Sequence, residues 1–427
     1  MLQASTPYSP TMTRGAVHSL RVQLLFVLML GVLVPTGALA LLLGWTTLHN
    51  AGLLSSITAA ACCAIATQLF FRRIARFPGV AAATYVLPVL GIAYGSVYTA
   101  FSMARIAYAN SVLVSCFVMT ALAMFIVAGL TWRKGYREIW VVPGGRVSQI
   151  RSIPNLSVHD LRSDEWQGED SVVLVADLHH DLPPGWERFL AEAAINGVPV
   201  YHYKHVAEAA TGMVQIDSLA ENSFGSLIPS LEYRKIKRGA DLLGAIIALP
   251  ILLPLCAVIS AAIAVDSRGG VLFRQVRMGY RGRTFQVIKF RTMVCANDGS
   301  NASSSLTRAD DERITRVGRF LRRTRLDELP QIINILRGEM SWIGPRPEAI
   351  SLSADYERRI PFYRYRHIVR PGITGWAQVN QGHVTQIDDI DRKLRYDFYY
   401  VKNFSYWIDI LITVRTIKVI LTGFGAK

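Results

Sequence analysis

Four long apolar segments near the start of the chain constrain its fold more than any other feature of the sequence. They cover residues 22–43, 51–71, 80–101 and 111–132, about 20 residues each. This is the length that an α-helix needs to cross roughly 30 Å of hydrocarbon. A cleaved signal peptide does not explain the first segment, because it is too long and three similar segments follow. We therefore expect four transmembrane helices within residues 1–136.

The basic residues that flank these segments predict their orientation. The loops on one side carry most of the positive charge, whereas the opposite loops carry little beyond Arg105. By the positive-inside tendency, both ends of the bundle face the cytoplasm. The residues that support this orientation are Arg14, Arg21, Arg72, Arg73, Arg76, Arg133, Lys134 and Arg137.

The whole chain is basic, with 46 Lys and Arg against 31 Asp and Glu and a formal net charge of +15. This balance suits nucleic acid, anionic lipid headgroups or phosphorylated substrates. The basic residues adjoin apolar segments and no known nucleic-acid-binding motif is present, so we expect membrane lipids and phosphate rather than nucleic acid. The five cysteines include no C-x-x-C pair, so they predict neither a zinc site nor a disulfide framework.

Residues 137–229 differ in character and predict a small cytoplasmic α/β domain. Strand-like and helix-like segments alternate in it, at residues 138–142, 171–176, 186–196 and 198–203. Such alternation is typical of a parallel, Rossmann-like sheet. The turn Pro143-Gly144-Gly145 follows the first strand but lacks the G-x-G-x-x-G spacing of a dinucleotide loop. We therefore expect a structural or assembly role here rather than nucleotide binding.

A further apolar segment, residues 242–265, lies near the start of a third region that covers residues 230–427. Basic clusters flank it on both sides, whereas a crossing helix would place one of them outside the cytoplasm. Pro250 and Pro254 lie within it, and each removes a backbone donor and bends a helix. We predict a re-entrant helix, broken at these prolines, that enters one leaflet and returns.

The segment from Arg322 to Pro330 is the richest in residues suited to chemistry. It belongs to a basic helix expected over residues 314–336 and interrupted by Pro330. Phosphoryl transfer needs a nucleophile, a divalent ion on the phosphates and cations for the charge that spreads. A carboxylate can itself be the nucleophile. Asp327 is thus a candidate nucleophile and Glu328 a candidate metal ligand or proton carrier, although an acidic pair is more often part of a solvated surface.

Two rigid turns and one strand-like segment supply further cations. Gly344-Pro-Arg346-Pro presents a guanidinium suited to bidentate contact with phosphate. Arg370 begins a second turn, and Lys289 and Arg291 lie in an alternating segment. Each alone is typical of a surface salt bridge, so only convergence on one site would make it functional. Residues 404–421 suit a helix at the lipid headgroups or a core helix.

Seven motifs occur in order within residues 233–427 and resemble those of the bacterial sugar transferases, the monotopic polyprenyl-phosphate phosphoglycosyl transferases. The motifs are Lys237-Arg238-x-x-Asp241, Phe273-x-Gln275, Lys289-Phe-Arg291-Thr-Met293, Leu326-Asp-Glu-Leu-Pro330, Gly344-Pro-Arg-Pro347, Arg370-Pro-Gly-Ile-Thr-Gly-Trp376 and Asp397-x-Tyr-Tyr-Val-Lys402. The four spans and the α/β domain precede this motif region in the chain. This arrangement resembles the long form of the family, which initiates exopolysaccharide, capsule or O-antigen (lipopolysaccharide) repeat units.

The resemblance implies that a sugar 1-phosphate passes from a UDP-sugar to undecaprenyl phosphate, with release of UMP. Asp327 matches the aspartate that forms a covalent phosphosugar intermediate, and Glu328 matches its partner carboxylate. The family uses Mg²⁺, with Glu328 and Asp397 as the expected metal ligands. The residues expected to bind substrate are Arg322, Arg346, Lys289, Arg291, Arg370 and Asp397. Leu253 and Arg325 depart from the family, because serine is common at both positions.

The expected architecture is a membrane α-helical bundle, a Rossmann-like α/β middle domain and an α+β monotopic catalytic domain with a re-entrant helix. The catalytic domain is expected on the cytoplasmic face of a bacterial inner membrane. One alternative is a catalytically inactive scaffold or regulator of polysaccharide assembly. A second, a polytopic prenyl-phosphate transferase, should show about ten spans. Glucose and galactose are the first donor sugars to consider, an N-acetylated or deoxy sugar is left open, and so is a homo-oligomer.

Overall fold

The computed structural model describes residues 19–43, 51–74, 85–133, 139–153, 156–162, 173–214, 229–294, 313–381 and 387–422. The chain divides into two compact units, Met1–Gly212 and Met213–Lys427. The predicted domain limits at residues 136 and 229 fall in or beside segments outside the described residues, and they stay predictions.

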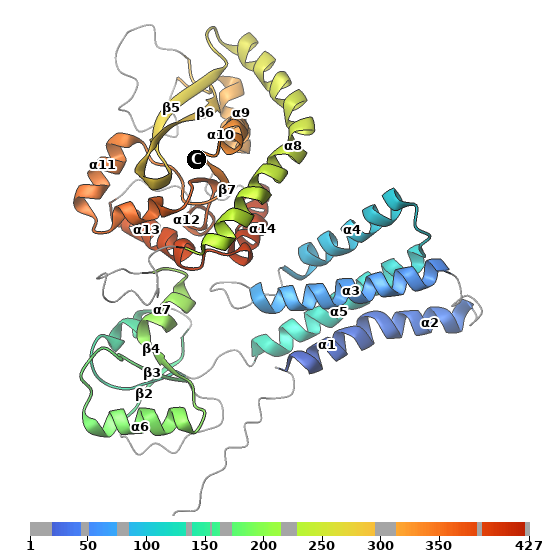
Figure 1. The fold of residues 1–427 in the computed structure, drawn as a ribbon, viewed down its shortest axis with the longest axis vertical. Helices are drawn as coiled ribbons and strands as arrows, with labels where there is room; N and C mark the ends of the chain where they lie inside the picture. The colour runs from blue at the N-terminus through green and yellow to red at the C-terminus, as the bar shows by residue number, and fades with distance from the viewer. Residues whose placement is uncertain are drawn as a thin grey trace, which may run out of the picture. The chain divides into compact units, whose positions relative to one another are not determined.

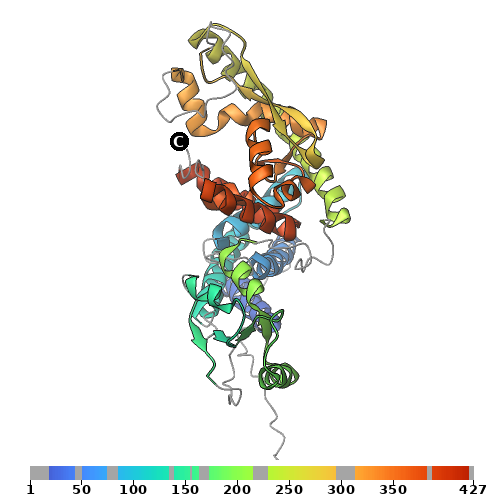
Figure 2. The same cartoon turned by 90° about the vertical axis from the view of Figure 1, so that its left-hand side faces the viewer.

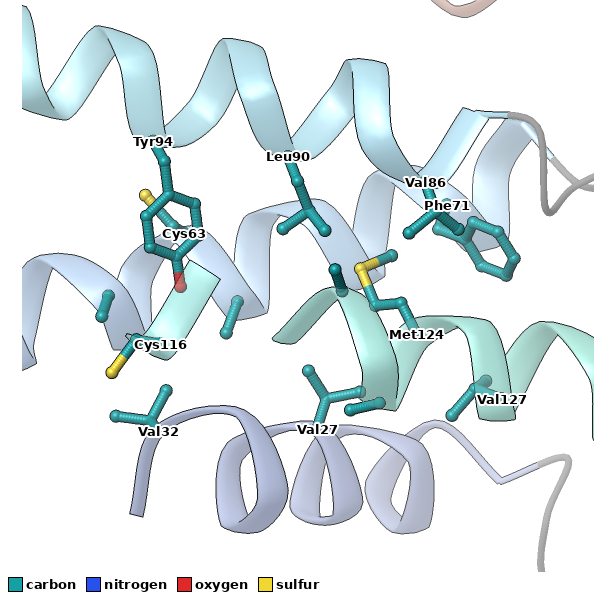
Figure 3. Close-up of a cluster of buried hydrophobic side chains, with 14 of the residues drawn as sticks. Val27, Val32, Cys63, Phe71, Val86, Leu90, Tyr94, Cys116, Met124 and Val127 are labelled. Carbon is teal, nitrogen blue, oxygen red and sulfur yellow. The ribbon is translucent and has the colours of Figure 1, made fainter. Parts of the chain in front are cut away.

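The first unit begins with the helices that the apolar segments predict. They are α1 (Leu20–Leu28), a π-helical turn (Met29–Leu33) and α2 (Val34–Leu43), then α3 (Ala51–Ile74), α4 (Val86–Ala104) and α5 (Asn110–Arg133). Four stretches among them are long and apolar enough to cross a membrane. Figure 3 shows Val27, Leu90 and Met124, from α1, α4 and α5, meeting in one buried cluster. Several leucines point outward instead, as lipid-facing side chains do.

The π-helical turn in the first span has a local cause. Pro35 lacks a backbone N–H, so the carbonyl of Gly31, four residues earlier, loses its usual helical donor. The hydroxyl of Thr120 on α5 donates to that carbonyl over 3.3 Å. Gly31 permits the approach, since a Cβ there would lie 2.5 Å from the Thr120 hydroxyl oxygen. A neighbouring helix thus satisfies the group that proline leaves free, as is typical of transmembrane proline.

The α/β part of the first unit contains a parallel sheet, as predicted, but with four strands instead of three. Its strands are β1 (Ile139–Val141), β2 (Val158–Asp160), β3 (Val173–Ala176) and β4 (Val200–His202), in the order β2-β1-β3-β4. Helix α6 (Pro184–Ile195) packs on one apolar face of the sheet. The 3₁₀ turn Val147–Ser152 and Tyr203 of α7 (Tyr203–Thr211) pack on the other face. The strand β2 was missed, because its short sequence is polar and mostly exposed.

The second unit opens with one helix of 36 residues, α8 (Leu231–Asp266), which is also long and apolar enough to cross a membrane. The helix starts at Leu231 rather than at residue 242. The side chain of Ser230 caps this start by accepting from the backbone N–H of Tyr233. The helix continues through Pro250 and Pro254, and Figure 1 shows it curved along its length. Whether it re-enters one leaflet stays a prediction.

The rest of this unit is mixed α and β. An antiparallel hairpin joins β5 (Leu272–Met278) to β6 (Thr284–Phe290), and Figure 2 shows it as a long twisted ribbon. Next come α9 (Arg316–Thr324), a 3₁₀ turn (Leu326–Gln331), α10 (Ile332–Arg337), β7 (Ser341–Ile343) and α11 (Ile350–Arg359). A 3₁₀ turn (Tyr363–Ile368), β8 (Gly372–Thr374), α12 (Trp376–Gln381), α13 (Ile387–Lys402) and α14 (Tyr406–Thr422) follow, with β8 parallel to β7.

Helix α14 covers most of residues 404–421, for which a headgroup helix and a core helix were both left open, and one of its faces is packed inside the unit. Its residues Ile408, Leu411 and Ile412 are buried. Asp409 accepts from Lys237 of α8 over 2.6 Å and from the hydroxyls of Tyr233 and Tyr400. This face of the helix therefore belongs to the core of the unit.

Candidate functional site

The acidic pair lies on a 3₁₀ turn, not within a long helix. Helix α9 ends at Arg325, which adopts left-handed backbone angles, φ 60° and ψ 14°. The expected interruption at Pro330 was therefore placed too late, because the break precedes Asp327 and Pro330 lies inside the 3₁₀ turn. A non-glycine residue in this region is strained by roughly 1–2 kcal/mol and needs support from its surroundings.

Close packing against the end of β6 provides that support. A Cβ at Gly318 of α9 would lie 2.1 Å from the carbonyl oxygen of Thr292, so only glycine allows α9 to approach this closely. Arg322 donates from Nε to the Thr292 hydroxyl over 2.8 Å. On the other side of the turn, Asn334 of α10 accepts from the N–H of Ile288 and donates to the carbonyl of Gln286. The turn that carries Asp327 and Glu328 is thus fastened to β6 at both ends.

Glu328 is buried and lies at the centre of a cluster of charges. Its Oε1 lies 2.9 Å from Nζ of Lys289 and 2.8 Å from Nη2 of Arg346, with Nη1 of Arg325 at 3.9 Å. Burial alone would raise the pKa of Glu328, but Arg346 and Lys289 outweigh it and hold this pKa well below its usual range. In turn, Glu328 raises the pKa of Arg346. Glu328 is therefore an ionised anchor for two cations.

Asp327 has the opposite electrostatic setting. Burial raises its pKa, Lys289 opposes that shift, and the charge of Glu328 adds to it. Its Oδ1 is buried and has no hydrogen-bond partner among the described residues. A carboxylate oxygen that no neighbour occupies is suited to attack an electrophile. Two adjacent carboxylates in different environments are the arrangement that separates a nucleophile from a supporting charge.

Arg346 is presented by a turn whose backbone is held from three directions. The carbonyl of Arg346 accepts from Arg366 over 2.8 Å, and that of Pro347 accepts from Arg277 over 2.7 Å. The carbonyl of Pro345 accepts from the N–H of Gly372 in the next glycine turn. A Cβ at Gly372 would lie 2.1 Å from the N of Gly344, so the two turns pack backbone against backbone. A side chain at Gly344 or Gly372 would prevent this contact, so both motifs require glycine there.

A second buried network supports this turn from behind. Arg366 lies 2.8 Å from Oδ2 of Asp397 and 3.7 Å from Oε1 of Glu348, and Lys393 also pairs with Glu348. Burial alone would raise the pKa of Glu348, but Lys393 and Arg366 keep it low, at about 2. Sequence reasoning missed Arg366, Glu348 and Lys393. The only signal was that Glu348 directly follows the Gly344-Pro-Arg-Pro347 motif.

The structure gathers only part of the predicted site in one place. Asp327, Glu328, Lys289 and Arg346 converge, and Arg322 holds the neighbouring Thr292. Asp397 lies in the network behind Arg346.

Two predicted substrate-binding residues contact main-chain carbonyls instead. Arg291 donates to the carbonyls of Ser267 and Arg268, just after the end of α8. Arg370 donates to the carbonyl of Gly338 and stacks over the ring of Tyr280. Both guanidinium groups are tied to the scaffold in this structure, so they lie apart from the contacts of Glu328.

Comparison with known proteins finds similarity to bacterial sugar transferases over most of the chain. Residues 232–423 match the family described as bacterial sugar transferase. A protein of Aeromonas hydrophila described as UDP-N-acetylgalactosamine-undecaprenyl-phosphate N-acetylgalactosaminephosphotransferase is 42% identical over 362 residues, 84% of this chain and 85% of its own length.

Two further relatives match over a shorter part of the chain. Both are described as UDP-glucose:undecaprenyl-phosphate glucose-1-phosphate transferases. That of Xanthomonas campestris pv. campestris is 46% identical over 41% of this chain and 37% of its own. That of Escherichia coli is 42% identical over 43% of this chain and 40% of its own. With its motifs, its charged cluster and the relative matched along most of its length, this chain belongs to the bacterial sugar transferase family.

Proposed function

We propose that this chain transfers a sugar 1-phosphate from a UDP-sugar to undecaprenyl phosphate, and so initiates the synthesis of a bacterial polysaccharide. The observation that carries this function is the buried Oδ1 of Asp327, which has no hydrogen-bond partner in the described part of the chain and lies beside the cluster of Glu328, Lys289 and Arg346. The relatives agree with it, because all three are described as transferring a sugar phosphate to undecaprenyl phosphate.

In the first half-reaction, the Asp327 carboxylate attacks the phosphorus that bears the sugar. The bond from that phosphorus to the bridging oxygen breaks, and UMP leaves with the electron pair. An oxygen of undecaprenyl phosphate then attacks the same phosphorus, and the carboxylate of Asp327 is released. Lys289 and Arg346 lie beside both carboxylates and supply positive charge that stabilises the phosphate under attack.

The oxygen atoms at this site also suit Mg²⁺. That ion is usually bound by one or two carboxylates together with substrate phosphates. Glu328 would hold the ion together with the phosphates of the donor, and the ion would neutralise part of their charge. Asp397 acts instead as a positioning residue, since its Oδ2 lies 2.8 Å from Arg366 and Arg366 holds the carbonyl of Arg346.

For the donor we propose an N-acetylhexosamine, with UDP-N-acetylgalactosamine as the first candidate. The relative with that substrate in its name matches 84% of this chain. The two glucose transferases match only 41% and 43% of it. This replaces the simple hexoses as the first donors to test.

We further propose that α8 re-enters the membrane and that the catalytic unit faces the cytoplasm. Near its start, Asp241 accepts from the Ser341 hydroxyl over 3.0 Å. Near its end, Asp266 accepts from the N–H of Val317 over 3.2 Å. A crossing helix would separate such contacts by roughly 30 Å of hydrocarbon, yet both belong to one folded unit. Between them the helix exposes apolar side chains, namely Leu243, Ile246, Ile247, Ile251, Leu253 and Val258.

The test is UMP release by detergent-purified protein with undecaprenyl phosphate, Mg²⁺ and a panel of four donors: the UDP-linked forms of N-acetylgalactosamine, N-acetylglucosamine, glucose and galactose. We expect release with UDP-N-acetylgalactosamine that is absent in Asp327→Asn. Release with a simple hexose alone would refute the proposed donor but keep the reaction. No release with any donor would contradict the transferase assignment and favour an inactive scaffold.

A further inference from the structure

Three side chains converge at one edge of the parallel sheet in the α/β part of the first unit. Asp177 directly follows β3, His179 lies two residues further on, and His202 is the last residue of β4. Figure 1 shows β3 and β4 as neighbours, and they pair in parallel. Their carboxyl ends therefore meet, at the edge where open α/β sheets commonly bind ligands.

The potential ligand atoms of these three residues lie within 4.8 Å of one another. Nδ1 of His179 faces Nε2 of His202 at 2.5 Å, and Oδ1 of Asp177 lies 3.7 Å from the same Nε2. Asp177 and His202 are buried, whereas His179 is exposed. The cluster thus has a fixed inner side and one side open to solvent.

The glycine turn after β1 orients the carboxylate. The backbone N–H of Arg146 donates to Oδ2 of Asp177 over 2.9 Å, and the N–H of His179 donates to Oδ1 over 3.3 Å. Gly145 has φ 58°, and a Cβ there would lie 2.4 Å from Oδ2 of Asp177. Glycine at this position is therefore needed for the carboxylate to lie where it does. Supporting hydrogen bonds of this kind orient the ligands of metal sites.

We propose that Asp177, His179 and His202 bind one divalent transition-metal ion of the Zn²⁺ class, separate from the catalytic unit. Two imidazole nitrogens and one carboxylate oxygen are a donor set that Zn²⁺, Co²⁺ and Ni²⁺ accept. Mg²⁺ and Ca²⁺ prefer oxygen ligands and are disfavoured here. The exposed side by His179 leaves room for a water or a further ligand.

Without metal, the three side chains form a hydrogen-bonded cluster. Nδ1 of His202 accepts from the N–H of Lys204 over 3.3 Å, which leaves the ring hydrogen on Nε2, facing His179. A metal ion bound at Nε2 replaces that hydrogen. The proton moves to Nδ1 of His202, which breaks the long bond from Lys204. The ion then joins the loop after β3 to the start of α7, which it should stabilise.

The experiment is Co²⁺ titration of full-length protein in detergent, stripped first with a chelator and desalted. We expect one equivalent per chain, with a visible absorption band that Zn²⁺ abolishes and excess Mg²⁺ does not. The band should be lost, and affinity reduced at least about a hundredfold, in His179→Gln and His202→Gln. The control His159→Gln changes a histidine of the same sheet that lies outside the cluster and stacks on Trp140, and it should bind as wild type does.

Two results would overturn the site: no Co²⁺ band in the wild type, or a band that persists in His179→Gln. Because His179 is exposed, its variant decides the matter even if His202→Gln fails to fold. Glu328→Gln should keep the full equivalent, which separates this ion from any ion at the catalytic unit.

Discussion

Arg366 donates from Nη2 to the backbone carbonyl of Arg346 over 2.8 Å, while the same guanidinium pairs with Asp397. Arg346, whose side chain contacts Glu328, is therefore positioned by Arg366, and Arg366 is in turn held by Asp397. This chain of contacts connects α13 to Glu328, the neighbour of the candidate nucleophile, through the buried Arg366 and the partly buried Arg346.

Asp397→Asn should destabilise the protein by about 3 kcal/mol, because it leaves the charge of Arg366 buried without its main partner. This loss is at the lower end for a broken buried pair, because Glu348 remains 3.7 Å from Arg366. Thermal unfolding of the purified protein measures the change. Asp391→Asn is the matched control on the same helix, because it breaks a half-exposed pair with Arg395 worth less than about 1 kcal/mol. Equal melting temperatures for the two variants would contradict the positioning role.

Asp327→Asn should lower the rate of UMP release at least about 10⁴-fold, as expected for loss of a nucleophile. It should not lower the melting temperature at neutral pH. The folded-state pKa of Asp327 is raised, so its ionisation opposes folding as pH rises from the unfolded pKa through the folded one. Removing the charge removes that penalty. Activity within tenfold of wild type would refute the assignment.

The pH dependence of UMP release should report on Asp327. Its carboxylate must be ionised to attack, so activity is lost as pH falls through its raised pKa. Lys289 and Arg346 lower that pKa, whereas burial and Glu328 raise it. Lys289→Met should therefore move the acid limb of the kcat/KM profile to higher pH. Arg291→Met is the control, because its guanidinium contacts main-chain carbonyls after α8 and should leave this limb in place. An unshifted limb in Lys289→Met would argue against electrostatic coupling to Asp327.

The re-entrant course of α8 predicts that both of its ends label from one side. Single cysteines at Glu232 and Gly270, both exposed, would be introduced into a background without the native cysteines. We expect a membrane-impermeant maleimide to react with both in inverted vesicles and with neither in intact spheroplasts. Reaction of the two positions from opposite faces would establish a full crossing.

Local patterns in the sequence by themselves determined much of this protein. Apolar runs of membrane length predict the helices α1 to α5, because spanning hydrocarbon requires length and composition alone. Short apolar strands predict the parallel sheet, and β2 was missed because its polar residues carry no such pattern. The order of the motifs points to Asp327, Glu328, Lys289 and Arg346, and the structure brings these four together.

Tertiary structure alone decided how the remaining charges are used. An arginine in the sequence can grip a phosphate, a carboxylate or a carbonyl equally well, so nothing local distinguishes Arg346 from Arg291 or Arg370. Burial and the positions of distant partners decide which group each arginine contacts. They also bring Arg366, Glu348 and Lys393 into the network that supports the Arg346 turn. The same holds for His179 and His202, which lie 23 residues apart in the chain. Only the parallel pairing of β3 and β4 places them side by side, because it brings the carboxyl ends of both strands to one edge of the sheet.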